Sequence, residues 1–159
     1  MNNLIIPLKH YSIRPVDISV DVMVIHYISA INLDKDKWDD LGLILGIFGQ
    51  YKLSAHYLIE RSGRIIEMVE PALKAWHAGR SEYGQRRNCN DYSIGVEIVG
   101  GSFVDFKSIQ YDSLNKLTND LKRDYPIKNI VGHEDIALPK GRKKDPGKRF
   151  DWDRIPKII

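Results

Sequence analysis

Long apolar runs mark the strands of the chain. Residues 20–28 (VDVMVIHYI) and 93–99 (SIGVEIV) are almost continuously apolar and rich in β-branched side chains, as expected of strands covered on both faces. Residues 127–132 form a third, shorter run. Residues 53–60 and 64–69 lie on either side of a Ser-Gly pair, so we expect them to form a hairpin.

Two stretches repeat apolar residues at helical spacing, and each predicts an amphipathic helix. The first is expected to start at residues 34–36 and the second to end before Pro126. The apolar positions are Trp38, Leu41, Leu45 and Phe48 in the first helix, and Ile109, Leu114, Leu117 and Leu121 in the second. Residues 2–15 are expected to be irregular, and residues 150–155 to form a terminal turn. This order of elements predicts an α/β fold, a single domain over residues 1–159 with a mixed central β-sheet flanked by helices.

Composition narrows the classes of function. The formal net charge of +3 is mild. Nucleic-acid binding needs a concentrated basic patch, so we expect no nucleic-acid partner. The single cysteine, Cys89, excludes an intrachain disulfide and is expected to be a packing residue. The sequence shows neither a membrane-spanning run nor a secretory signal, so we expect a cytoplasmic monomer without a membrane partner.

Two ionisable side chains interrupt the apolar strands. His26 lies near the end of the first strand, and Glu97 lies between Val96 and Ile98 in the second. Burying either group costs free energy unless it has a partner or a role. The alternatives are a satisfied core histidine for His26 and a solvent-facing sheet edge for Glu97. A glutamate of raised pKa beside a metal-bound water is the usual general base of zinc-dependent amide hydrolysis.

A polar loop after the last strand carries a second group of candidate residues. His133 follows the strand directly, and Asp145 precedes a Pro-Gly turn that holds the carboxylate on a defined loop. Lys143 lies two positions before Asp145 and points the same way if the loop is extended. A catalytic zinc takes three His or carboxylate ligands and leaves one position for water, so His133 is a candidate ligand. An ordinary basic loop is the alternative.

Four separated segments carry a family resemblance. They are VIHYIS (24–29), LSAHYLIERSGRI (53–65), AWHAGRSEYGQRRNCNDYSIGVEIVG (75–100) and VGHEDIALPKGRKKDPGKRFDW (131–152). In this order they resemble the zinc-dependent N-acetylmuramoyl-L-alanine amidases of the amidase-2 family, most closely the AmpD type. Phage endolysin amidases and peptidoglycan-recognition proteins share the fold of that family. The resemblance implies a zinc site in a surface groove, and hydrolysis of the amide bond between N-acetylmuramic acid and L-alanine in peptidoglycan or muropeptides.

The resemblance also implies a role for each matched residue. The zinc ligands would be His26, His133 and Asp145. Glu97 would be the general base, and Lys143 would stabilise the oxyanion. These roles agree with the chemistry of the residues, because a metal ion and an ammonium group together offset the negative charge that develops during amide hydrolysis.

The resemblance places His77, Tyr27 and Asn88 on the substrate side. Two of them depart from the usual AmpD pattern, since Tyr27 stands in place of Asn and Asn88 in place of Arg. Arg80 lies in a loop and is a candidate contact for the peptide carboxylates, with an ordinary solvated loop as the alternative. Trp76 is expected in the core rather than as a platform for a sugar ring. His56, in the hairpin, is expected to be structural or to support the site from outside.

Three functions remain open at this point. The chain could be a cytosolic amidase that recycles anhydromuropeptides, or a phage-type endolysin that acts on intact wall and leaves the cell through a holin pore. The third alternative is a non-catalytic peptidoglycan-binding module, which needs neither Glu97 nor Lys143. Tyr27, Asn88, the short segment 32–52 and a basic loop together predict hydrolysis of intact peptidoglycan, with little preference for a 1,6-anhydro sugar.

Overall fold

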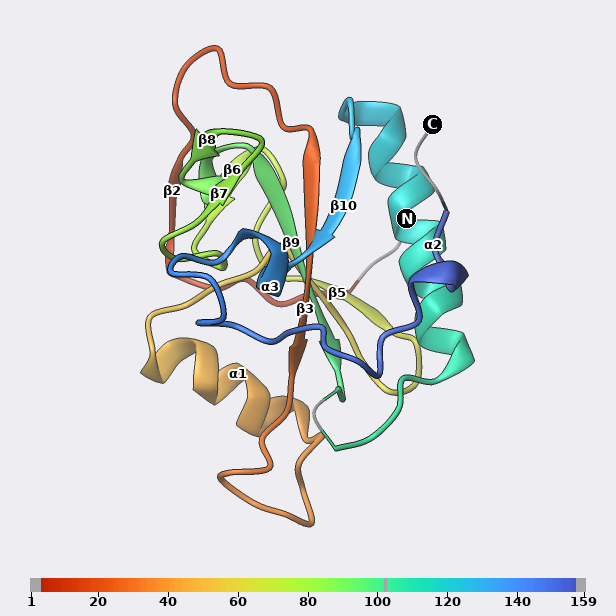
Figure 1. Ribbon diagram of the computed structural model, residues 1–159. Helices are drawn as coiled ribbons and strands as arrows, with labels where there is room; N and C mark the ends of the chain where they lie inside the picture. The colour runs from red at the N-terminus through yellow and green to blue at the C-terminus, as the bar shows by residue number, and fades with distance from the viewer. Residues whose placement is uncertain (1–3, 102, 157–159) are drawn as a thin grey trace.

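A six-stranded mixed sheet forms the centre of the molecule (Figure 1). The computed structural model describes residues 4–101 and 103–156. The strand order is β1-β5-β4-β9-β3-β10, in which β4 and β5 are antiparallel and the other neighbours are parallel. The strands are β1 (Leu4–Ile5), β3 (Val22–Ile28), β4 (Tyr57–Ile59), β5 (Ile65–Glu67), β9 (Ser93–Val99) and β10 (Asn129–Gly132). The predicted hairpin and the predicted mixed α/β fold are both confirmed.

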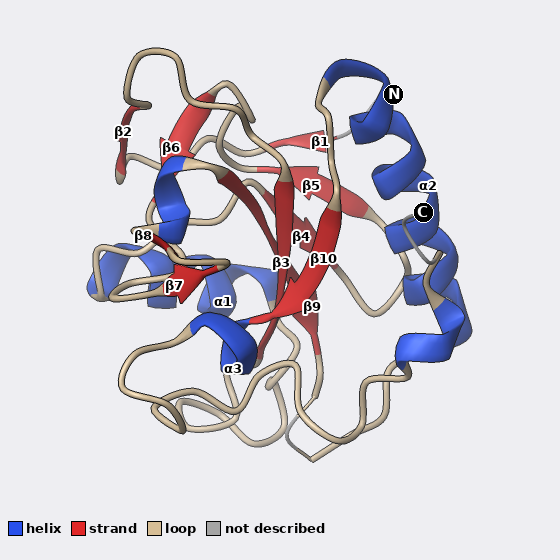
Figure 2. Cartoon of the chain, turned by 45° about the horizontal axis from the view of Figure 1, so that its top comes forward, coloured by secondary structure: helices blue, strands red, loops and turns tan. Residues whose placement is uncertain are grey.

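Helices cover both faces of this sheet (Figures 1 and 2). α2 (Ser108–Asp124) packs on one face, in the same cluster of buried residues as Met23 and Ile25 of β3. The short α3 (His133–Ile136) packs on the other face, in the cluster that contains Val22 and Val24. Successive side chains of a strand point to opposite faces. His26 therefore points to the face of α3 and away from α2.

The first helix begins later than the apolar spacing predicts. α1 spans Leu41–Gln50 and is capped by Asp40, whose side chain accepts the Leu43 N–H at 2.9 Å. Asp34 instead accepts the backbone N–H groups of Asp36 and Lys37, so it closes a turn ahead of the helix. The predicted start at residues 34–36 is wrong because this carboxylate satisfies a local turn and not a helix end.

Short strands also occur in residues 2–15, which are predicted to be irregular, and in residues 73–87, for which the sequence gives no strand prediction. Besides β1, β2 (Tyr11–Ile13) pairs with β6 (Leu73–Ala75), and β7 (Glu82–Tyr83) pairs with β8 (Arg86–Arg87). Of the segment 2–15, residues 2 and 3 lie outside the described residues. One-turn 3-10 helices form at Cys89–Asp91 and, as predicted, at Trp152–Arg154. None of the helices in the described part of the chain has the length and apolar character needed to cross a bilayer.

Candidate metal centre

The register of two central strands places His26 beside Glu97. β3 and β9 run parallel, and these two residues are partners in the ladder. Val96 and Ile98 belong to the core on the α2 side of the sheet, so Glu97 points to the opposite face, as His26 does. The two ionisable residues that interrupt the apolar strands are thus neighbours on one face.

The end of β10 brings His133 and Asp145 to the same place. His133 is the first residue of α3, directly after β10, and β10 pairs with β3. The loop with Asp145 passes so close to Gly132 that a Cβ there would lie 2.7 Å from Cδ of Pro146. The Glu134 N–H donates to the Asp145 backbone oxygen at 2.9 Å and ties the loop to α3. The absence of a side chain at Gly132 therefore allows Asp145 to reach the histidines.

Three potential ligand atoms face one another at this point. Nδ1 of His26 lies 2.9 Å from Nδ1 of His133, and Oδ2 of Asp145 lies 3.0 Å from both nitrogens. In a tetrahedral zinc site with Zn–N bonds of ~2.0–2.1 Å, ligand atoms are roughly 3.3 Å apart. The separation of the three atoms therefore suits a zinc ion with little rearrangement.

The charge state of the cluster also suits a metal cation. Burial lowers the pKa of His26 to about 4, so the ring is neutral at pH 7 and keeps a lone pair. The carboxylate of Asp145, whose Oδ2 lies 3.0 Å from both Nδ1 atoms, supplies the negative charge of the donor set. Imidazole nitrogens with one carboxylate favour zinc over magnesium or calcium, which prefer oxygen ligands.

Glu97 stands beside this cluster with one carboxylate oxygen unpartnered. Its Oε2 is buried and has no hydrogen-bond partner among the described residues. Burial first, and then repulsion by Asp145, raise the pKa of Glu97 well above its usual value, while Lys143 opposes the shift. A buried oxygen without a partner is costly. The position of Oε2 is suitable for a hydrogen bond with a water molecule or a substrate.

One open pocket of about 470 Å³ is bordered by the five residues with an expected role in the reaction, which are His26, Glu97, His133, Lys143 and Asp145. His77 and Tyr27 line it as well, so the structure brings seven of the nine predicted site residues together. Asn88 does not line this pocket and instead borders a separate hollow of about 390 Å³ beside Trp76. Arg80 is exposed, and its backbone oxygen accepts hydrogen bonds from Leu138 and Arg142.

The structure corrects one expectation about the supporting aromatic residues and agrees with two others. Trp76 is 38% exposed and stacks on His10 at 6.1 Å, so its assignment to the core is wrong. Its indole N–H donates to Ser12 Oγ at 3.2 Å. His56 is fully buried, and its Nδ1 accepts the Gly95 N–H at 2.9 Å. Cys89 is buried in the core, as expected.

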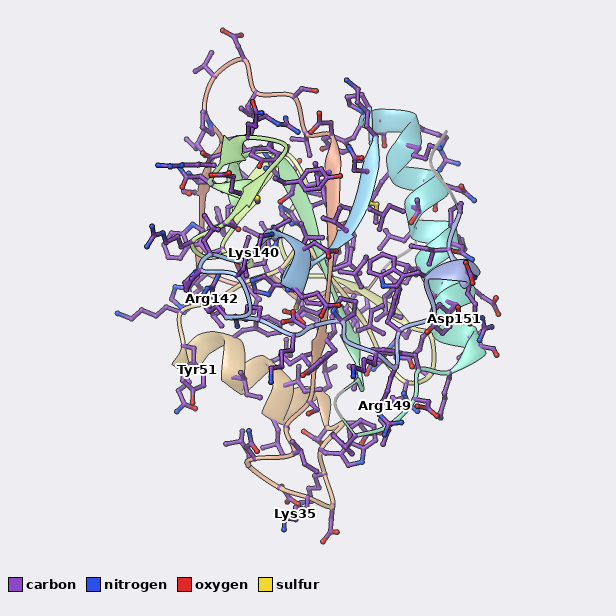
Figure 3. The ribbon with its side chains drawn as sticks, in the orientation of Figure 1. Lys35, Tyr51, Lys140, Arg142, Arg149 and Asp151 are labelled. Atoms are coloured by element: carbon purple, nitrogen blue, oxygen red, sulfur yellow. The ribbon has the colours of Figure 1, made fainter. Side chains whose placement is uncertain are left out.

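Two supporting residues carry no signal in the sequence. Oδ1 of Asn90 accepts the backbone N–H groups of both His77 and Ala78. Arg142 lies on the loop that follows α3 (Figure 3) and donates hydrogen bonds to the backbone oxygens of Leu138, Ala78 and Arg80. An asparagine in a loop and an arginine in a basic run are both common, so the sequence does not predict which backbone groups they bind.

Comparisons with known proteins agree with this geometry. The family profile of the N-acetylmuramoyl-L-alanine amidases (amidase-2) matches residues 16–148. The 1,6-anhydro-N-acetylmuramyl-L-alanine amidase AmpD of Haemophilus influenzae is 40% identical over 159 residues, which cover 91% of this chain and 85% of that protein. A crystal structure of a selenomethionine AmpD derivative matches with a TM-score of 0.80 and 36% identity, over 96% of this chain and 91% of the other.

More distant structures share the fold. The amidase AmiD of Escherichia coli, solved with the substrate anhydro-N-acetylmuramic acid-L-Ala-D-γ-Glu-L-Lys, matches with a TM-score of 0.70 and 30% identity over 89% of this chain and 58% of the other. An endolysin amidase from Clostridium intestinale (18% identity, TM-score 0.69, 96% of this chain and 91% of the other) and a Drosophila peptidoglycan-recognition protein (16%, 0.58, 96% and 92%) resemble the chain in fold alone. The protein belongs to the amidase-2 family, an AmpD-type N-acetylmuramoyl-L-alanine amidase that hydrolyses the amide bond between N-acetylmuramic acid and L-alanine.

Proposed function

We propose that the chain acts on soluble muropeptides that carry a 1,6-anhydro sugar, with zinc held by His26, His133 and Asp145. The observation that carries the metal and the hydrolysis is the close cluster of three ligand atoms beside Oε2 of Glu97, which has no hydrogen-bond partner among the described residues. The amidase-2 family is zinc-dependent in general, and the donor set of this chain fits that metal. The AmpD relatives are named for the 1,6-anhydro substrate.

Different residues of the pocket have different roles in the proposed reaction. A bound zinc ion supplies Lewis acidity, which polarises the scissile carbonyl and makes water more acidic. Oε2 of Glu97 accepts a proton from the attacking water and returns it to the nitrogen of the departing L-alanine amine. The Lys143 ammonium, on the same pocket wall, stabilises the oxygen that becomes negative when the carbonyl is attacked. The C–N bond breaks, and the muramic acid carboxyl and the peptide amine are released.

Two features of the fold weaken the prediction that the chain acts on intact peptidoglycan. Asn88 borders a different hollow from the pocket that His26 and Glu97 line, which we call the metal-side pocket. In the basic loop, Arg149 pairs with Asp105 at 2.6 Å, so the carboxylate offsets one of the positive charges that would attract an acidic polymer. Tyr27 does border the pocket. The sugar preference is therefore measured directly in the experiment below. The monomeric state and the cytoplasmic location remain predictions.

Two measurements on the purified protein test the proposal. Metal analysis should find about one zinc per chain, and His133→Ala and Asp145→Ala should lose both zinc and activity. Full zinc occupancy in both variants would show that the ligands are misassigned. The ratio of kcat/KM on 1,6-anhydromuropeptide to that on a reducing-end muropeptide tests the substrate class, with clearing of purified sacculi as the third substrate. Clearing of sacculi without a preference for the anhydro sugar would establish the intact wall as the substrate.

A further inference from the structure

The two metal-site histidines are held from behind by one two-residue segment. Nε2 of His26 lies 3.0 Å from Nδ1 of His77, and Nε2 of His133 donates to the backbone oxygen of Ala78 at 3.1 Å. In both rings the other nitrogen, Nδ1, is the one that faces Asp145. Residues 77 and 78 therefore contact the rear of both rings at once.

The same segment is fixed in the backbone and in the side chain. Oδ1 of Asn90 accepts the N–H of His77 at 3.1 Å and the N–H of Ala78 at 2.8 Å. The His77 ring lies flush against the backbone of β9, because a Cβ at Gly95 would be only 2.4 Å from its Cγ. The ring is therefore positioned by contacts that do not involve the metal site.

The direction of each hydrogen bond follows from a backbone carbonyl, which can only accept. Oγ of Ser93 donates its hydrogen to the Cys89 oxygen, so it accepts from Nε2–H of His77 at 3.3 Å. In the neutral His77 ring this leaves Nδ1 as the acceptor. Nε2 of His26 must then carry the hydrogen, and Nδ1 of His26 is left with a free lone pair.

We propose that His77 is a positioning residue that sets the tautomer of His26, with Ser93 and Asn90 fixing the direction and place of His77, so that Nδ1 is ready for the metal. The inference rests on the proposed function, because it concerns the zinc site. Both ring nitrogens of His77 are engaged by protein groups. His77 therefore lines the pocket without a free nitrogen for the substrate, in contrast to its implied role as a substrate contact.

The test compares two replacements of His77 in the full chain. In His77→Leu no acceptor remains for His26. In His77→Asn the amide oxygen stands as many bonds from the backbone as Nδ1 does, so it can accept the same hydrogen. Competition with a chromophoric zinc chelator should show that His77→Leu binds zinc roughly 10–100-fold more weakly than wild type. His77→Asn should remain close to wild type.

NMR of the zinc-loaded, ¹⁵N-histidine-labelled protein gives a second readout that a loss of folding would not imitate. The His26 Nε2–H signal should be slow to exchange in wild type and lost in His77→Leu. The His133 Nε2–H signal should persist in both proteins, because Ala78 still accepts it.

The outcomes separate the two proposals. If wild type binds no zinc, the proposed metal centre is wrong. If wild type binds zinc and His77→Leu binds it equally well, the metal centre stands and the positioning role of His77 is overturned. Equal weakening of zinc binding in His77→Leu and His77→Asn would also overturn it.

Discussion

Replacing Gly95 by alanine tests how closely the metal centre depends on the packing behind His26. The added Cβ would lie 2.4 Å from Cγ of His77 and 2.7 Å from its Nδ1. Ordinary contact begins at 3.4 Å, so the ring must move by about 1.0 Å (3.4 − 2.4) or the strand must shift. A displacement of that size disturbs the 3.0 Å contact between His77 and His26, because hydrogen bonds weaken steeply with poor geometry.

The expected cost has two parts, and a matched substitution isolates them. Overpacking should lower the free energy of unfolding by about 1–3 kcal/mol, and the disturbed support of His26 should weaken zinc binding roughly tenfold to a hundredfold. In the described part of the chain, no atom beyond the adjoining residues and the backbone of the helix itself lies within 4 Å of a Cβ added at Gly46 of α1. Gly46→Ala should therefore raise the free energy of unfolding by roughly 0.5–1 kcal/mol and leave zinc affinity unchanged.

Urea unfolding with EDTA measures the stability of both variants, and chelator competition measures their zinc affinity. If Gly95→Ala matched wild type in both quantities, the close approach of His77 to β9 would have no energetic consequence. The argument for a rigid support behind the metal site would then fail.

Three further predictions concern the chemistry and the pH dependence. Glu97→Gln keeps the shape of the side chain but removes the proton acceptor, so kcat should fall roughly 10²–10⁴-fold while zinc content stays at the wild-type level. Lys143→Met should lower kcat roughly 10²–10³-fold by removing the charge that offsets the oxyanion, with little change in KM. Burial lowers the pKa of His56 from 6.5 to about 3, so the stability linked to its neutral form is complete above pH 6.5 and is lost as the pH falls toward 3. In His56→Asn the slope of unfolding free energy against pH should decrease by up to about 1.4 kcal/mol per pH unit in that window, as measured by urea unfolding in EDTA.

Each of these predictions has a contrary result. An effect confined to KM would make Glu97 or Lys143 a substrate contact rather than a participant in the reaction. Loss of zinc from Glu97→Gln would place that carboxylate among the ligands. An unchanged pH slope in His56→Asn would mean that the buried imidazole titrates alike in the folded and unfolded chains.

Local patterns in the sequence were sufficient to locate β3, β4, β5, β9 and β10 of the central sheet and to single out two residues within them. β9 spans the same residues, Ser93–Val99, that the apolar run predicts. His26 and Glu97 stood out because ionisable groups are costly in covered strands, and both border the metal-side pocket. The helix start was wrong because an aspartate closes a turn or caps a helix with the same carboxylate, and the choice between the two depends on the backbone that follows.

By itself, the sequence determined the fold class and the family, and the resemblance to that family indicated the five residues proposed for the reaction, because each depends on residue type at a known position in the chain. Only the tertiary structure decided which nitrogen of each histidine faces the metal site, since this depends on His77 and Ala78, 51 and 55 positions away from their partners. It also separated Asn88 from the pocket and exposed Trp76. Periodicity reports which face of an element is buried, whereas these contacts depend on strand register and loop packing, which neighbours in sequence do not encode.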